Sequence, residues 1–192
     1  TIEIFDDSIE RALAFDLPHY STYSLQIEPK TVFYQRHQKG KLHKPPEEVE
    51  ASMFELLIAK MKRNGKYQYE VSNFSEPGFE SKHNLTYWDN NYYYGFGAGA
   101  SGYLPGERHI NLRPFPAYVK AANESGRPVL HIDQIGKKEQ IEEELFLGLR
   151  KRTGVSKADF KTKYTLNVHD VYQKPIKDLI GRGWLEEDDE WI

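Results

Sequence analysis

The first 74 residues alternate between helical and strand-like patterns of apolar residues. Residues 2–13 repeat apolar side chains at intervals of three and four, as on one face of a helix, and residues 19–27 are rich in Tyr, Thr, Leu and Ile. A second helical pattern covers residues 45–65, and a second strand-like segment covers residues 67–74. Such alternation with long crossovers is typical of a parallel sheet with helices outside it. The sequence therefore predicts an α/β fold, as an open sheet or as part of a (β/α) barrel.

The remaining residues divide into a glycine-rich region and a helical module. Strand-like residues 92–104, a tight turn and a return strand are followed by a predicted helix over residues 115–124. Residues 126–138 have no clear period and look like an interdomain connection. Beyond them, three short helices and a terminal hairpin predict a winged-helix-like module. We therefore expect two domains, residues 1–126 and residues 127–192.

Composition and charge exclude several classes of protein. The chain has 39% hydrophobic and 14% aromatic residues, which is typical of a globular domain. Its formal net charge is −3, and the terminal segment 186–190 is entirely acidic, so we expect no nucleic-acid partner. The longest apolar run is far too short to span a bilayer, and no signal-peptide pattern opens the chain. These features predict a cytoplasmic protein.

The chain contains no cysteine. This excludes disulfides, thiolate zinc sites and cysteine-ligated iron–sulfur clusters within these residues. The chain also lacks an initiator Met and opens directly on a helix-start signal at Thr1. We therefore expect it to be a piece of a longer protein.

A glycine-rich run, Gly95, Gly97, Gly99 and Gly102, follows a predicted strand, as in a dinucleotide-binding turn. That turn requires a helix immediately afterwards, because the N-terminus of the helix binds the pyrophosphate. Pro105 argues against such a helix here. The glycines are explained equally by the close approach of a neighbouring backbone or of a ligand.

Among the seven histidines, His83 has the most distinctive surroundings. It opens the string HNLTYW, which places an imidazole, an amide and two aromatic rings within six residues. Imidazole ligates iron, and aromatic rings cover flat ligands. The alternative is that His83 caps a loop, and the residues alone leave both interpretations open.

Several strings, in order along the chain, resemble a known family. They are SxYSLxIEPxTxFY at residues 21–34, YEVSNF at residues 69–74, HNLTYW at residues 83–88 and YYGFGAGASGY at residues 93–103. Together they resemble the radical S-adenosylmethionine proteins of the oxygen-independent coproporphyrinogen III oxidase family. The pattern HNxxYW is similar to the branch regarded as heme chaperones, and residues 143–156 resemble the C-terminal domain of that branch.

The resemblance implies a fold and a set of cofactors. It predicts the C-terminal part of a partial (β/α) barrel followed by a small winged-helix-like helical module. Members of the family hold a 4Fe–4S cluster through CxxxCxxC, and the cluster coordinates S-adenosylmethionine. This chain lacks those cysteines, so we expect it to be inactive as an enzyme by itself.

The resemblance also assigns residues to the cofactor. Tyr23 and Gln26, on the predicted strand after the first helix, would face the adenosine of S-adenosylmethionine, with Tyr23 stacked on the purine. The alternative is that both are ordinary residues of the barrel interior. Glu70 and Asn73 alternate with their neighbours, so at most one face of that strand points inward.

A second group of residues is implied to line the tetrapyrrole site. Gly97, Ala98, Ala100 and Ser101 correspond to a strand whose small side chains make room for the cofactor or the tetrapyrrole. By the same resemblance, His83 is the residue expected to contact heme iron.

Two functions follow from the resemblance. The first is a heme chaperone that binds heme and delivers it to cytochromes, which HNLTYW favours. The alternative is a true coproporphyrinogen III dehydrogenase that decarboxylates the propionates of its substrate. A free-standing winged-helix regulator is disfavoured by the acidic terminal segment. An incomplete barrel would expose a sheet edge, which predicts association of copies as a homodimer.

Overall fold

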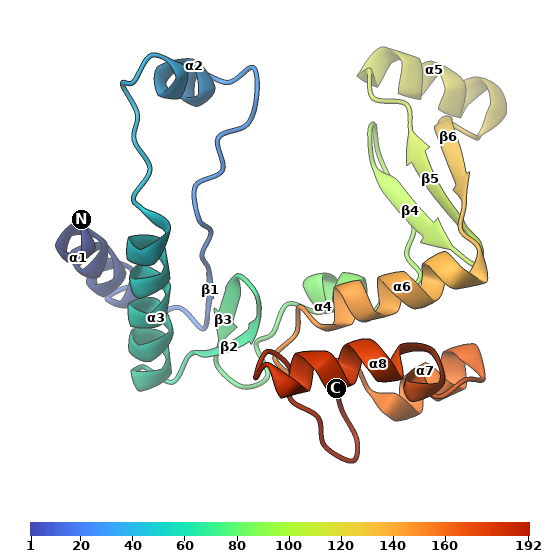
Figure 1. The fold of residues 1–192 in the computed structure, drawn as a ribbon. Coiled ribbons are helices and arrows are strands. Elements are labelled where there is room, and N and C mark those ends of the chain that lie inside the picture. The colour runs from blue at the N-terminus through green and yellow to red at the C-terminus, as the bar shows by residue number, and fades with distance from the viewer. The chain divides into compact units, whose positions relative to one another are not determined.

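The strands of the chain form two small antiparallel sheets. The computed structural model describes residues 1–192, which divide into two compact units, residues 1–80 and residues 81–192. The first unit contains a sheet of strand order β1–β3–β2, and the second contains a sheet of order β4–β5–β6 (Figure 1). The mixed α/β class is confirmed. The predicted parallel sheet is wrong, because every strand pair in both sheets is antiparallel.

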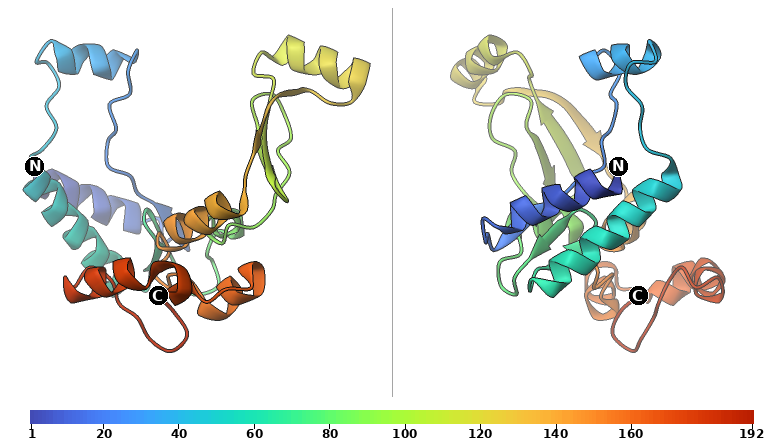
Figure 2. Two further views of the ribbon diagram at one scale, coloured as in Figure 1. Left: turned by 45° about the vertical axis from the view of Figure 1, so that its right-hand side comes forward. Right: turned by 90° about the vertical axis from the view of Figure 1, so that its left-hand side faces the viewer.

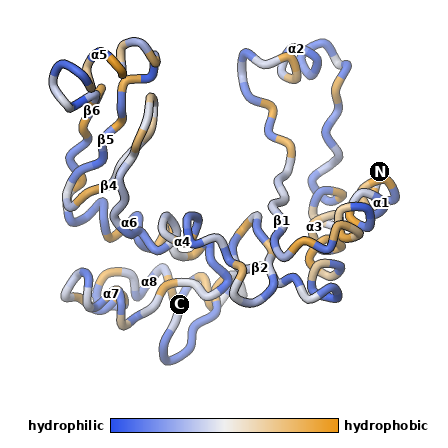
Figure 3. Tube along the Cα trace, turned by 180° about the vertical axis from the view of Figure 1, so that it is seen from behind, coloured by the Kyte–Doolittle hydropathy of each residue, from blue (hydrophilic) through white to orange (hydrophobic).

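Two helices of the first unit pack on each other, as Figure 2 shows. α1 (Ile2–Leu13) begins at Thr1, whose hydroxyl accepts a hydrogen bond from the Ile4 N–H at 3.4 Å. α3 (Glu47–Arg63) follows Pro46. It has acidic residues in its first turn and basic residues in its last turn, and these charges interact favourably with the helix dipole. Apolar residues recur along both helices (Figure 3). The core of the unit consists of Ile9, Tyr20, Leu57, Met61 and Phe74.

The sheet of the first unit is shorter than the sequence predicts. It consists of β1 (His19–Ser21), β2 (Tyr67–Glu70) and β3 (Asn73–Ser75). The strand predicted over residues 67–74 is a hairpin, because the chain turns between β2 and β3. Strands joined by so short a turn pair antiparallel. The strand predicted over residues 19–27 ends early, since β1 finds only the three residues of β3 to pair with.

A long excursion separates β1 from α3. It carries one short helix, α2 (Val32–Gln38), which begins at Thr31, whose hydroxyl accepts from the Tyr34 N–H at 3.1 Å. α2 contains no buried residue and stands at the tip of the excursion in Figure 1. Its exposed apolar side chains, Val32 and Phe33 among them, show that this segment has little core of its own.

The second unit contains the predicted hairpin and one additional strand. β4 (Ser101–Leu104) and β5 (Glu107–Asn111) are joined by a turn in which Gly106 adopts a φ of +78°. β6 (Val129–Gln134) pairs with β5 inside the segment 126–138, which was predicted to be an interdomain connection. Five of the six β6 residues are exposed. The strand therefore lacks the alternation of apolar and polar residues by which a sequence indicates a strand. The predicted domain boundary therefore falls inside the second unit.

Five helices complete the second unit. They are α4 (Lys82–Trp88), α5 (Phe115–Ser125), α6 (Lys137–Gly148), α7 (Lys157–Tyr164) and α8 (Val168–Gly181). α5 and the three C-terminal helices confirm the prediction from apolar periodicity. No helix of the chain is both long enough and apolar enough to cross a membrane.

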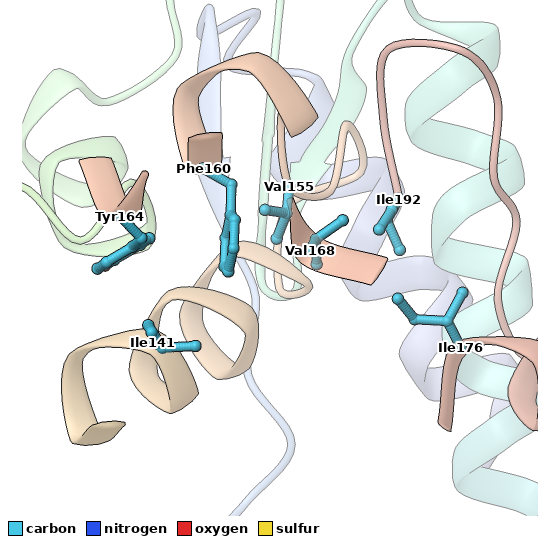
Figure 4. Packing of buried hydrophobic residues seen from close by; sticks show 7 residues of the cluster. All are labelled: Ile141, Val155, Phe160, Tyr164, Val168, Ile176 and Ile192. Atoms are coloured by element: carbon cyan, nitrogen blue, oxygen red, sulfur yellow. The ribbon is translucent and has the colours of Figure 1, made fainter. Parts of the chain in front are cut away.

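The predicted terminal hairpin is wrong. Residues 183–192 contain no strand, and Ile192 instead exchanges two backbone hydrogen bonds with Val155, at 2.8 and 3.0 Å. Gly154 permits this approach, since a Cβ there would lie 2.0 Å from the Ile192 carbonyl oxygen. The chain end therefore closes the helical core instead of projecting as a wing. That core, shown in Figure 4, consists of Ile141, Val155, Phe160, Tyr164, Val168, Ile176 and Ile192.

A buried carboxylate joins α6 to α7 and to the end of α4. Glu144 is 6% exposed and accepts hydrogen bonds from the Tyr164 hydroxyl at 3.0 Å and from the Lys163 ammonium at 2.9 Å. The same ammonium donates to the carbonyl oxygen of Asp89, the C-cap of α4, at 2.6 Å. Burial, followed by the nearby Glu144 charge, raises the pKa of Tyr164. The phenol therefore stays a hydrogen-bond donor to the carboxylate.

We expect Phe160→Ala to destabilise the second unit by about 3 to 5 kcal/mol, because Phe160 is fully buried in its core and truncation leaves a cavity. The control is Phe146→Ala, since Phe146 is 66% exposed and its loss costs much less. All three tryptophans, Trp88, Trp184 and Trp191, lie in the second unit, so urea unfolding followed by tryptophan fluorescence reports on that unit. Equal losses for both variants would contradict the assigned core.

A second prediction concerns alkaline pH. Tyr103 is 2% exposed, and burial raises its pKa to about 12. A raised pKa adds stability that is complete below the unfolded value near 10 and is lost as pH rises towards 12. The free energy of unfolding should therefore fall by roughly 2 to 3 kcal/mol more in the wild type than in Tyr103→Phe over this window. The control Tyr94→Phe, at a tyrosine that is 70% exposed, should behave like the wild type.

Candidate functional site

The HNLTYW string forms most of α4. The helix begins at Ser81, whose hydroxyl accepts from the Asn84 N–H at 3.3 Å. His83 therefore lies inside the helix, and the interpretation of His83 as the cap is wrong. Its spacing of four residues from Tyr87 brings the two side chains together on one face. His83 Nε2 lies 3.2 Å from Tyr87 Oη, and the rings meet edge to face at 4.9 Å.

A row of aromatic rings continues from α4 into the glycine-rich segment. The Tyr87 ring meets the Tyr93 ring edge to face at 4.7 Å, and Tyr93 lies 6.4 Å from Tyr103. Tyr93 and Tyr103 also exchange two backbone hydrogen bonds of 2.9 Å. His83 is exposed at one end of this row, while Tyr103 is buried at the other. The row therefore connects an accessible imidazole to the core of the unit.

The glycine-rich segment is a turn held by side chains, not a continuous strand. Of the strand predicted over residues 92–104, only β4 and the bridge at Tyr93 are present. Gly97 adopts a φ of +103°, which breaks the extended conformation. Asn111 Nδ2 donates to the carbonyls of Gly95 and Gly97, each at 3.0 Å. At Gly95 a Cβ would meet the Ser101 backbone at 2.3 Å. Close approach of the backbone therefore accounts for this glycine.

The four small residues predicted to line the site lie together in this turn and at the start of β4. Gly97 and Ala100 are half-buried, and Ala98 and Ser101 are exposed. The Gly97 N–H donates to the hydroxyl of Tyr118 at 3.1 Å. None of the four lines the cavity beside α4, so their predicted role at a ligand stays a prediction.

A cavity of about 280 Å³ lies between the aromatic row and α6. Its walls combine phenols, amides, apolar side chains and one ion pair; the lining residues are Tyr87, Asn90, Asn91, Tyr93, Tyr103, Arg108, Glu143, Phe146 and Leu147. Arg108 makes two hydrogen bonds of 2.9 Å to the two oxygens of Glu143. Its guanidinium carbon lies 5.0 Å from the centre of the Tyr103 ring.

The sequence does not reveal this ion pair. Arg108 and Glu143 are 35 residues apart, and each looks like an ordinary surface charge in the sequence. The nearest signal was the resemblance of residues 143–156 to the family's C-terminal domain, which singled out no residue.

The environment of Trp88 differs from that of His83 at the exposed end of the aromatic row. Its ring is half-buried, and the guanidinium of Arg150 lies 5.1 Å from the ring centre and 5.2 Å from that of Phe146. The indole Nε1 is buried without an acceptor. Trp88, the last residue of α4, therefore packs against Arg150, two residues beyond the end of α6.

The residues predicted to bind the cofactor lie in the first unit. Tyr23 is 74% exposed and Gln26 is exposed, and both lie beyond the end of β1 instead of on a strand. Glu70 and Asn73 are both buried and bond to each other across the β2–β3 turn. Both residues point inward because the turn between them breaks the strand alternation on which the one-face prediction depended.

The side chains around His83 suit one kind of metal centre. No group of three or more His, Cys, Asp or Glu side chains gathers in the structure to hold a bare metal ion. His83 therefore offers a single imidazole beside aromatic rings. Such a site fits an iron whose other ligands come from a porphyrin. The chain has no cysteine, so its residues do not fit a 4Fe–4S cluster.

The chain is similar along its whole length to proteins named heme chaperone HemW. It is 48% identical to the protein of Bacillus subtilis (strain 168) and 46% identical to that of Lactococcus lactis subsp. lactis (strain IL1403), over 192 residues in both cases. A more distant relative, at 29% identity, is the mitochondrial radical S-adenosyl methionine domain-containing protein 1 of Danio rerio. The chain spans about half the length of these relatives, 51%, 50% and 46%.

Two further comparisons concern the domain and the fold. Residues 135–192 match the family of the HemN C-terminal domain. The solved structure of coproporphyrinogen III oxidase (HemN) from Escherichia coli, described as a radical SAM enzyme, superimposes with a TM-score of 0.72. The match covers 99% of this chain and 47% of that one, and at 13% identity it shows a shared fold. These matches show that residues 135–192 carry the HemN C-terminal domain and that the whole chain is similar to about half the length of the proteins named heme chaperone HemW.

Proposed function

We propose that the chain acts as part of a heme chaperone, which binds heme and hands it to cytochromes. The observation that carries the proposal is the exposed imidazole of His83 at the end of an aromatic row. The names of its relatives, heme chaperone HemW, point the same way. Heme offers a flat apolar face to aromatic side chains and an iron to a single imidazole, so it suits both features.

The hydrogen bond to Tyr87 decides which nitrogen of His83 meets the iron. Nε2 is engaged by the Tyr87 hydroxyl at 3.2 Å, whereas Nδ1 has no hydrogen-bond partner. When Nε2–H donates to the tyrosine oxygen, Nδ1 carries the lone pair and is free to coordinate. A partner on the second nitrogen fixes the tautomer and the orientation of the ring. Tyr87 is therefore a positioning residue for His83.

The other residues that the resemblance names have separate supporting roles in this proposal. Tyr23 and Gln26 face the adenosine of S-adenosylmethionine, and the high exposure of the Tyr23 ring leaves its face free to stack. Gly97, Ala98, Ala100 and Ser101 leave space for the tetrapyrrole. A 4Fe–4S cluster in the whole protein takes its thiolates from outside these residues. No step of heme binding proposed for this chain passes through the cluster.

We also propose the finer architecture that the resemblance implies. Residues 1–126 would form the flank of a partial (β/α) barrel, and residues 127–192 would form a winged-helix-like domain. The fold similarity to HemN supports a shared architecture, and the three helices α6, α7 and α8 support a helical module after β6.

His83→Ala should weaken heme binding at least about tenfold, because it removes the iron ligand. The melting temperature should change little, since the side chain is exposed. The measurement is a titration of heme into the 192-residue chain, followed by the shift of the Soret band. His131→Ala is the matched control, because His131 is also exposed but lies on β6 and is not part of the aromatic row.

Tyr87→Phe should give an intermediate loss of heme affinity, since the imidazole remains but its orientation is no longer fixed. An unchanged titration in His83→Ala would remove His83 from the site. A parallel fall in melting temperature and heme affinity in that variant would make its role structural.

The edge of β6 supports a proposed homodimer. β6 pairs only with β5, so its other side presents free backbone groups, and Leu130 and Ile132 are 56% and 43% exposed. Ile132→Lys should therefore reduce association, because a charge on an edge strand opposes pairing with another edge. Light scattering over a range of concentrations measures this, with Val119→Lys on the exposed face of α5 as control. A wild-type chain that stays monomeric at high concentration would contradict the dimer.

A further inference from the structure

The cavity beside α4 contains one cation and one anion, and they neutralise each other. Arg108 and Glu143 are the only residues with formal charges among those that line it. Their side chains are 31% and 25% exposed, and two hydrogen bonds of 2.9 Å join them. Glu143 therefore holds the guanidinium of Arg108 in position at the wall of the cavity.

The guanidinium of Arg108 is held from two directions. The ring of Tyr103 lies under it at 5.0 Å, and β5 fixes its backbone. Burial raises the pKa of Tyr103 to about 12, so the ring beneath the cation is uncharged at neutral pH. The planar fork of an arginine matches the two oxygens of any carboxylate equally well. A second carboxylate could therefore take the place of Glu143 without moving Arg108.

The rest of the cavity suits a flat and mainly apolar group. Phe146 and Leu147 supply apolar surface, and the phenols and the amides of Asn90 and Asn91 are neutral. A cavity of about 280 Å³ is small for a whole ligand of ordinary size. It suits one edge of a larger ligand that carries a carboxylate, with the remainder lying outside.

We propose that Arg108 binds a propionate carboxylate of the tetrapyrrole by exchanging its partner from Glu143 to the ligand. The proposal rests on the function proposed above, because heme is a dicarboxylate with apolar edges. Tyr87 connects the two ends of the site: it lines the cavity that holds Arg108 and hydrogen-bonds to His83.

The exchange replaces one carboxylate by another on the same cation. Glu143 is partly exposed on α6, so it returns to water when it is released. Glu143 therefore competes with the ligand. Substitutions at the two residues should therefore have opposite effects on heme binding. Loss of Arg108 weakens it, and neutralisation of Glu143 strengthens it.

The test compares heme with heme dimethyl ester, in which both propionates are blocked. Each ligand is titrated into the 192-residue wild type, Arg108→Gln, Arg108→Lys, Glu143→Gln and the control Arg127→Gln, and the Soret shift is followed. Arg127 is exposed and lies outside the cavity. Arg108→Gln should bind heme about tenfold more weakly than the wild type and bind the ester equally well. Arg108→Lys should fall between them, since an ammonium keeps the charge but loses the fork.

Glu143→Gln should bind heme several-fold more tightly and leave the ester unchanged. This variant decides the question if Arg108→Gln does not fold, which thermal unfolding would reveal. Equal losses of heme and ester in Arg108→Gln, or unchanged heme affinity in Glu143→Gln, would overturn the carboxylate proposal alone. A wild type that binds neither ligand would overturn the proposed function and this inference with it.

Discussion

The buried carboxylate of Glu144 is the interaction on which the arrangement of the second unit depends. A charge that is 6% exposed must be paired and hydrogen-bonded, because its desolvation is otherwise too costly. Lys163 and Tyr164 of α7 supply those bonds. Lys163 also reaches the carbonyl of Asp89, so the same contact attaches the end of α4. One buried charge therefore sets three helices relative to one another.

That constraint also places the candidate site. Glu143 precedes Glu144 on α6, and with the latter turned into the core the former faces the cavity and Arg108. Phe146 follows on the same helix as part of the cavity wall. The other wall comes from α4 and the bridge between Tyr93 and Tyr103. The cavity thus exists because the helical module, within residues 135–192 that match the HemN C-terminal domain, is fastened to the HNLTYW helix.

The glycine-rich segment shapes the candidate site without lining its cavity. Its glycines let the chain turn tightly and pass close to its own backbone, and Asn111 holds the turn. The turn brings Tyr93 alongside Tyr103, and so builds the aromatic row that ends at His83. Tyr93 and Tyr103, on either side of this turn, line the cavity.

The sequence by itself determined most of the helices and the position of the motifs, but it did not predict α4. The helical segments α1, α3, α5 and α6 to α8 were predictable, because periodicity, caps and proline act within a few residues. The HNLTYW string pointed to His83 because it places an imidazole, an amide and two aromatic rings within six residues, which is also a local pattern. Strand pairing was not predictable in this way. The alternation over residues 67–74 shows strand content but cannot reveal a turn that folds the segment back on itself.

Only the tertiary structure decided which distant residues meet. Arg108 and Glu143 are 35 residues apart, and Lys163 and Glu144 are 19 apart, so no local pattern relates them. β6 was missed because it is exposed on both faces and leaves no apolar alternation. The closing contact of Ile192 with Val155 depends on a glycine conformation at Gly154 that a sequence does not specify. Local periodicity encodes which face of an element is buried, whereas the partner on that face is chosen by packing and by the need to pair buried charge.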